Sequence, residues 1–144
     1  PRIVAGLATH SSQSVSKADF SGLSGVTIGN TSKTTRQVGD DSETEVANHL
    51  TRLGHIIFDR NWRTKWCEVD IISKKDGTLY FTEVKHRKND KAGDGFDAIT
   101  PKKLQQMKFA AELYATKTPG YDLRLAVAKT AGDPPVLQDI LYIE

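Results

Sequence analysis

The hydrophobic pattern first becomes regular between about Asp40 and Leu53. Val46, Leu50 and Leu53 recur every three or four residues, which is the period of an amphipathic helix. Residues with N-capping side chains open this segment, and Gly54 follows it as a stop signal. The candidate caps are Asp40, Asp41 and Ser42. We therefore predict a helix over this segment.

Short apolar runs after Gly54 predict strands, and one further helical segment interrupts them. Thr100 is its candidate N-cap, Pro101 fits the first turn, and the segment runs to about Thr116. Its residues at helical spacing, which we expect to pack on the sheet, are Leu104, Met107, Ala111 and Tyr114. The predicted strands lie around 55–58, 68–72, 79–85, 121–128 and 136–143. The resulting order, α-β-β-β-α-β-β, predicts an α/β (α+β) fold with a mixed sheet of about five strands flanked by helices.

Two of the predicted strands carry charged residues in otherwise apolar runs. Glu68 and Asp70 are two residues apart, and so are Glu83 and Lys85. Because side chains alternate between the two faces of a strand, each pair should project to one side. The intervening Lys75-Asp76-Gly77 has turn-forming residues that would fold the two strands into an antiparallel hairpin. We therefore expect three carboxylates and one ammonium group to converge.

Such a cluster is typical of a site that binds a divalent metal ion. Crowded carboxylates become protonated unless a cation holds them, and Mg²⁺ or Mn²⁺ prefers oxygen ligands. Asp70 and Glu83 are the candidate metal ligands, and Glu68 is a further one. Lys85 can orient or deprotonate an attacking water, or neutralise charge on a phosphate. The alternative is an ordinary hairpin with a cross-strand Glu–Lys pair, because an E-x-K triplet alone is a very short motif.

Glu43 in the predicted first helix is a further candidate for the acidic site. Glu43, Ala47 and Leu50 fall at positions i, i+4 and i+7, so Glu43 should lie on the inward face of the helix. From there it could reach the metal ion or its water. The alternative is a glutamate that only interacts favourably with the N-terminal end of the helix dipole.

The order and spacing of these motifs resemble the YraN-like endonuclease family. Its members carry Gly-Glu near a first helix, then N-x-R, G-E-I-D-x-I, F-V-E-V-K and a later lysine that opens a helix. Within roughly Thr35 to Glu144, the matching segments are Ser42-Glu43, Asn61-Trp62-Arg63, Cys67 to Ile72, Phe81 to Lys85 and Thr100-Pro101-Lys102-Lys103. The resemblance implies a restriction-endonuclease-like core of the PD-(D/E)XK type. In that core an acidic residue from the first helix joins Asp, Glu and Lys of the hairpin around one or two metal ions.

Three positions depart from the family pattern without removing a charged residue. Ser42 and Cys67 stand where glycine commonly precedes each glutamate, and Thr82 replaces an aliphatic residue. Cys67 is the single cysteine, so it cannot form an internal disulfide. We interpret it as a small buried residue rather than a nucleophile.

Basic residues surround the candidate site and predict contacts with phosphates. The segment Arg60–Trp66 alternates cations with aromatics, a mixture that suits nucleic acid. Alternatively its tryptophans, Trp66 more than Trp62, cap the core while the charges face water; Arg63 is the better binding candidate. We interpret 86–95 as a mobile loop that closes over substrate, or as a merely solvated turn. Further candidate phosphate-binding residues, with surface solvation as their alternative role, are Arg87, Lys88, Lys102 and Lys103.

Composition narrows the classes of protein. A length of 144 residues with 38% hydrophobic and 26% charged residues fits one domain with a core. We see neither a membrane-spanning segment nor a secretory signal, and expect a cytoplasmic protein without membrane contacts. The formal charge of +2 does not by itself indicate nucleic-acid binding. We interpret residues 1–35, rich in Ser, Thr and Gly, as a flexible arm or linker, and residues 36–144 as the nuclease domain.

These patterns lead to the hypothesis of a Mg²⁺- or Mn²⁺-dependent endonuclease that prefers DNA to RNA, with branched repair or recombination intermediates among its candidate substrates. A second hypothesis is a nuclease toxin tip that acts on RNA and has an immunity protein as its partner. A third is a non-catalytic nucleic-acid-binding repair module, which the intact set of Asp70, Glu83 and Lys85 argues against. A homodimer would suit an enzyme that cuts both strands of a duplex.

Overall fold

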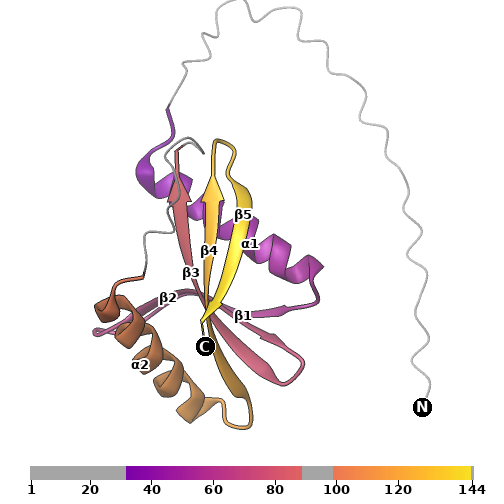
Figure 1. Ribbon diagram of the computed structural model, residues 1–144, viewed down its shortest axis with the longest axis vertical. Coiled ribbons are helices and arrows are strands. Elements are labelled where there is room, and N and C mark those ends of the chain that lie inside the picture. The colour runs from indigo at the N-terminus through magenta and orange to yellow at the C-terminus, as the bar shows by residue number, and fades with distance from the viewer. Residues whose placement is uncertain (1–31, 89–98, 144) are drawn as a thin grey trace, which may run out of the picture. The chain divides into compact units, whose positions relative to one another are not determined.

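A five-stranded mixed sheet carries one helix on each face (Figure 1). The computed structural model describes residues 32–88 and 99–143. Its elements are α1 (Thr35–Arg52), β1 (Ile56–Arg63), β2 (Glu68–Lys75), β3 (Thr78–Arg87), α2 (Pro101–Lys117), β4 (Asp122–Ala131) and β5 (Val136–Ile143). The predicted fold class and the order α-β-β-β-α-β-β are confirmed.

The strands follow one another across the sheet in the order β1-β2-β3-β4-β5. β3 and β4 run parallel and are joined through α2, whereas all other neighbours are antiparallel. The predicted hairpin between β2 and β3 is present, with Lys75 opposite Thr78. Its two turn residues, Asp76 and Gly77, both have positive φ, at 46° and 78°, which is the conformation of a tight type I′ turn.

Two hydrophobic clusters attach the helices to opposite faces of the sheet. The α2 cluster is the set of buried residues Cys67, Val69, Ile72, Leu79, Phe81, Met107, Ala110, Ala111 and Leu125. The α1 cluster is the set Val46, Ala47, Leu50, Ile71 and Ala128. The α2 residues predicted to face the sheet do so, since Met107 and Ala111 are buried while Leu104 and Tyr114 pack against the cluster.

The first helix begins earlier than the sequence pattern predicts. Thr34 is its N-cap and forms a capping box with Gln37: each side chain bonds the other residue's backbone N–H. Ser42, predicted as a cap, is buried in the helix, where its hydroxyl donates to the Val38 carbonyl at 2.8 Å. The capping assignment of Asp40, Asp41 and Ser42 was therefore wrong. The capping box at Thr34 starts the helix at Thr35, so these three residues lie inside it.

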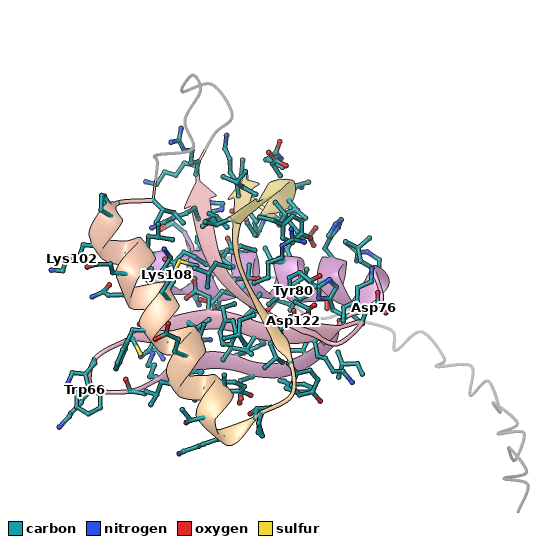
Figure 2. The ribbon with its side chains drawn as sticks, turned by 60° about the horizontal axis from the view of Figure 1, so that its bottom comes forward. Trp66, Asp76, Tyr80, Lys102, Lys108 and Asp122 are labelled. Atoms are coloured by element: carbon teal, nitrogen blue, oxygen red, sulfur yellow. The ribbon has the colours of Figure 1, made fainter. Side chains whose placement is uncertain are left out.

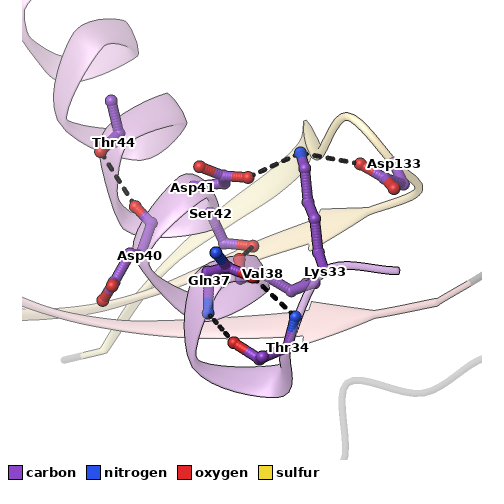
Figure 3. A network of polar contacts seen from close by, with 9 residues as sticks. All are labelled: Lys33, Thr34, Gln37, Val38, Asp40, Asp41, Ser42, Thr44 and Asp133. Carbon is purple, nitrogen blue, oxygen red and sulfur yellow. Dashed lines mark hydrogen bonds and ion pairs between the residues drawn. The ribbon is translucent and has the colours of Figure 1, made fainter. Parts of the chain in front are cut away.

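Lys33 connects this helix start to the turn between β4 and β5. Its ammonium group lies 2.8 Å from Asp41 and 3.1 Å from Asp133 (Figure 3). Both carboxylates raise the pKa of Lys33, mainly through these hydrogen bonds. At the other end of α1, Leu53 is 45% exposed, so its predicted place on the buried stripe was wrong. The chain has already left the helix there, with Leu53 as the C-cap.

β1 is longer than predicted, because it continues past Phe58 through Arg63. Its pairing with β2 extends to Arg63 opposite Glu68, so the cation and aromatic residues up to Arg63 lie in a strand and not in a loop. His86 and Arg87 likewise belong to β3. Most of the predicted loop 86–95 lies outside the described residues.

The predicted arm 1–35 also lies outside the described residues, except for its last four positions. Both helices of the described part are too polar or too short to cross a membrane.

Candidate active site

Glu83 and Lys85 continue the face of β3 that packs against α2. Leu79 and Phe81 on that face belong to the α2 cluster, and Glu83 follows where the cluster ends. The Glu83 side chain is only 11% exposed, whereas that of Lys85 is 52% exposed. The alternation predicted for this strand is therefore present, and it places one buried carboxylate beside one accessible ammonium group.

Two lysines from different elements meet the Glu83 carboxylate. Lys103 Nζ lies 3.0 Å from Glu83 Oε2, and Lys85 Nζ lies 3.5 Å from Glu83 Oε1. Lys103 is in the first turn of α2, and its backbone N–H donates to the side chain of the N-cap Thr100 at 3.1 Å. The helix cap thus fixes the position from which Lys103 reaches the sheet.

Asp70 reaches the same region because β2 departs from simple alternation. Val69 and Ile72 pack in the α2 cluster, but Ile71 packs in the α1 cluster. The β2–β3 pairing reaches Ile71 and does not include Asp70, the residue that precedes it in the sequence. In place of a further strand pair, the Val84 N–H donates to Asp70 Oδ2 at 2.7 Å. This bond ties the Asp70 carboxylate to the backbone directly after Glu83.

The surroundings of Asp70 raise its pKa to about 7, from an ordinary value of 3.8. Burial is the largest cause, and the neighbouring negative charge of Glu83 is the next. Glu43 adds to the rise, while the Val84 N–H and Lys103 oppose it. Ionisation of Asp70 is therefore unfavourable, because its surroundings are partly buried and carry more negative than positive charge. Such a group favours a cation beside it.

Glu43 faces inward from α1, as predicted, and its side chain is 14% exposed. Asn61 Nδ2 donates to Glu43 Oε2 at 2.8 Å, and Arg60 Nη2 lies 3.8 Å from the same oxygen. Two consecutive residues of β1 can both reach α1 because Asn61 has φ of 52°, which interrupts the alternation. Trp62 then returns to the α2 cluster.

Sequence reasoning missed these roles of Arg60 and Asn61. The available signal was an asparagine inside a strand pattern, since asparagine tolerates positive φ better than most residues.

The structure places Glu68 away from Asp70's immediate partners. Its carboxylate pairs with Arg63, whose Nη2 and Nε lie 2.7 Å and 2.9 Å from Glu68 Oε1. Both side chains line a polar cleft of about 620 Å³ beside the acidic site. The cleft lining also includes Arg36, Asp40, Glu43 and Asn61. The role of Glu68 as a metal ligand stays a prediction.

No three Asp, Glu, His or Cys side chains within residues 32–88 and 99–143 form a group that could hold a metal ion by themselves. A complete protein cage, as Zn²⁺ or Ca²⁺ would take, is thus not built into this part of the chain. Mg²⁺ differs, because it keeps several waters and commonly binds through one or two carboxylates together with substrate phosphates. Asp70 and Glu83 offer that smaller donor set.

The predicted phosphate-binding residues occupy three places around the site. Arg63 and Lys103 are engaged by Glu68 and Glu83. Lys102 is exposed at the N-terminal end of α2 (Figure 2). Arg87 ends β3 and Lys88 directly follows it.

For the two tryptophans the structure decides between the two predicted roles, and it reverses the order in which we expected them to cap the core. Trp62 packs against the α2 cluster with an edge contact of 5.4 Å to the Tyr114 ring. Trp66, favoured as a core cap, is 61% exposed. Trp66 lies beyond the end of β1, in the loop that leads to β2. Cys67, by contrast, is buried as expected, with its sulfur 3.2 Å from the Thr64 hydroxyl.

The sequence that builds this site is similar to the members of one protein family. Residues 42–129 match the model of the uncharacterised protein family UPF0102. A UPF0102 protein of Deinococcus radiodurans is 39% identical over 107 residues, which are 74% of this chain and 79% of the relative. A UPF0102 protein of Mycobacterium avium is 37% identical over 69% of this chain and 77% of its own. A third, from Fusobacterium nucleatum, is 32% identical over 69% and 85% respectively. The matched segment contains every acidic and lysine residue of the candidate site.

Proposed function

This chain belongs to UPF0102, the YraN family, and we propose that it is a metal-dependent nuclease that hydrolyses phosphodiester bonds of nucleic acid, DNA in preference to RNA. One observation carries the proposal. Asp70 is partly buried near Glu83 and Glu43 and has a pKa raised to about 7, while the exposed Lys85 ammonium group lies 3.5 Å from Glu83. Strongly perturbed carboxyl groups next to an accessible cation are characteristic of catalytic sites.

The donor chemistry of the site fits a hard divalent ion. Asp70 and Glu83 would hold Mg²⁺ or Mn²⁺ through carboxylate oxygens, with Glu43 near enough to act on Asp70's charge. A bound ion would lower the pKa of a coordinated water and offset the charge that develops on the phosphate. The geometry of two carboxylates leaves the remaining positions to waters and substrate.

The chain's own cations would act directly on the substrate. Lys85 combines an exposed ammonium group with a fixed stem on β3, so it can orient the attacking water or stabilise negative charge on the phosphate. Lys103 pairs with Glu83 at 3.0 Å from the start of α2 and holds that carboxylate in place. Arg87, Lys88 and Lys102 would contact phosphates without reading bases.

A cleavage assay of the purified protein tests the function. The substrates are labelled single-stranded, duplex and branched DNA, and RNA, each with Mg²⁺, Mn²⁺ or EDTA. We expect cleavage that requires the metal and that prefers one of the DNA forms. Lys108→Ala, which removes an exposed lysine of α2 outside the site (Figure 2), is a matched control and should cut at the wild-type rate. Binding without cutting, under every condition, would favour the non-catalytic repair module.

Asn61 gives a test of the link between β1 and Glu43. Asn61→Gly should retain the fold, because glycine adopts positive φ freely, but should reduce cleavage about tenfold, because Glu43 loses its 2.8 Å partner. Asn61→Ala should reduce cleavage to the same extent. It should also lower the free energy of unfolding by ~1 kcal/mol, because alanine is strained at positive φ. Urea unfolding and initial rates of both variants separate the two effects. Full activity of Asn61→Gly would show that Glu43 needs no such support.

A further inference from the structure

Trp66 is exposed on a loop whose backbone is held firmly. The loop joins β1 to β2, and the Thr64 hydroxyl accepts hydrogen bonds from the backbone N–H groups of Trp66 and Cys67 at 3.1 Å and 3.2 Å. The Thr64 N–H in turn donates to the Cys67 carbonyl at 2.9 Å. Cys67 is buried and anchors the loop in the α2 cluster. The backbone that carries the large exposed ring is therefore held in place, and the ring extends from the body of the protein (Figure 2).

A cleft of about 480 Å³ lies beside this ring and is lined mainly by apolar and aromatic groups. Trp62, Leu113 and Tyr114 contribute to its lining, and Trp66 lines it as well. The Tyr114 side chain is held in place by a hydrogen bond, which its hydroxyl donates to Asp59 at 2.6 Å. The cleft thus combines one exposed ring with rings that the core already holds.

The charged residues nearest the cleft opening and the exposed ring are lysines, and the Asp59 carboxylate nearby is occupied by the Tyr114 hydroxyl. Lys117 lines the cleft, and the Lys65 ammonium group lies 4.3 Å from the centre of the Trp66 ring. No carboxylate occurs among the described residues that line the cleft. An aromatic surface with a cationic rim is complementary to a nucleotide, whose base stacks on the ring while its phosphate meets the lysines. Stacking of a base on an indole is stronger than an exposed cation–π contact, so Lys65 can move from the ring to the phosphate.

We propose that Trp66 and the adjoining cleft bind an unpaired base of the nucleic-acid substrate, so that the protein selects substrates with a single-stranded segment. This inference rests on the proposed nuclease function, because it assigns a substrate class to the same site. Asp70 lies four positions after Trp66, and four residues of chain span at most about 14 Å. A strand stacked on Trp66 therefore passes the acidic site within a few nucleotides. A fully paired duplex has no unstacked base to offer, and its binding should not depend on Trp66.

Binding measurements without cleavage test this inference. The full chain carrying Asp70→Asn is titrated in EDTA with a labelled oligothymidylate and with a blunt duplex of equal length, followed by fluorescence anisotropy. Adding Trp66→Ala should weaken oligothymidylate binding about tenfold and leave duplex binding unchanged. Trp66→Phe keeps a ring for stacking and should retain most of the affinity. Lys108→Ala, a substitution at an exposed residue of α2 that does not line the cleft, should leave the binding of both oligonucleotides unchanged.

Three results would overturn the inference. They are equal binding of oligothymidylate with and without Trp66, an equal loss on the oligothymidylate and the blunt duplex, and no binding of oligothymidylate by either protein. Thermal unfolding checks that Trp66→Ala is folded, which its exposure leads us to expect. Failure here differs from failure of the nuclease proposal, because wild-type protein that cuts DNA in Mg²⁺ while Trp66→Ala binds normally would refute only the stacking site.

Discussion

Replacing Asp70 with asparagine is expected to abolish metal-dependent cleavage and, above neutral pH, to make the protein more stable. The wild-type carboxyl group has a pKa of about 7 in the folded protein, against 3.8 ordinarily. The folded state therefore holds this proton more tightly than the unfolded state does. Below about pH 4 the group is protonated in both states and does not lower the free energy of unfolding. As the pH rises from about 4 to 7 the free energy of unfolding falls, and above about pH 7 the contribution of Asp70 falls no further.

Asparagine removes this loss because it does not ionise. Its side-chain oxygen can still accept the Val84 N–H that Asp70 Oδ2 accepts at 2.7 Å. Each pKa unit corresponds to 1.36 kcal/mol, and partial relaxation of the site reduces the full shift, so we expect a gain on the order of 2 kcal/mol at pH 8. The gain should shrink toward zero near pH 4. Urea unfolding in EDTA at several pH values measures it.

Asp122→Asn provides the matched control for this comparison, because it removes a carboxylate from an exposed position of β4. It should leave the pH dependence of unfolding close to that of the wild type. Mn²⁺ should raise the Tm of the wild type but not that of Asp70→Asn, because a bound cation stabilises the ionised carboxylate. Identical pH profiles for Asp70→Asn and the wild type would contradict the burial argument, whatever the cleavage assay gives.

A stability gain from removing a site residue would have a simple physical meaning. Asp70 is kept in a place where burial and two other carboxylates disfavour its charge. Proteins retain such costly arrangements chiefly where function requires them. The lower stability at high pH and the need for a metal ion would thus have the same cause, which is the unfavourable negative charge of Asp70.

The sequence was sufficient for the parts of the site that follow regular alternation. Glu83 and Lys85 share a face of β3 because the strand is regular there, and Glu43 faces inward because α1 is a regular helix. Asp70 was predicted as a site residue, but the irregular backbone that brings it and Asn61 to their places was not foreseen. The positive φ of Asn61 and the change of face around Asp70 come from the pairing of β1, β2 and β3, which local spacing does not encode.

The helix start and the tryptophans illustrate a second limit. Several residues from Thr34 to Ser42 have capping side chains, and spacing alone does not say at which of them the helix begins. The reciprocal hydrogen bonds of Thr34 and Gln37 place the N-cap at Thr34. Burial of Trp62 and exposure of Trp66 depend on where α2 ends over the sheet. Both outcomes are tertiary, and a periodic pattern in sequence carries little information about them.

The second large effect is expected for Lys85→Ala, which should slow cleavage by about 10²–10³ with little change in stability. Lys85 is half exposed and its contact with Glu83 is 3.5 Å, so the ion pair should contribute under about 1 kcal/mol to folding. Lys103→Ala should behave differently. Lys103 is less exposed and closer to Glu83, at 3.0 Å, and its loss should lower the Tm as well as the rate.

The division between kcat and KM identifies what Lys85 does. If its ammonium group acts on the transition state, Lys85→Ala lowers kcat and leaves KM nearly constant; a lysine that only binds phosphate would raise KM and reduce the salt dependence of binding instead. Lys85→Arg keeps the positive charge but cannot exchange a proton near neutral pH. Rescue by arginine would therefore assign charge stabilisation, and failure of rescue would favour the orientation or deprotonation of water. A Lys85→Ala protein that cuts at the wild-type rate, as Lys108→Ala should, would remove Lys85 from the mechanism.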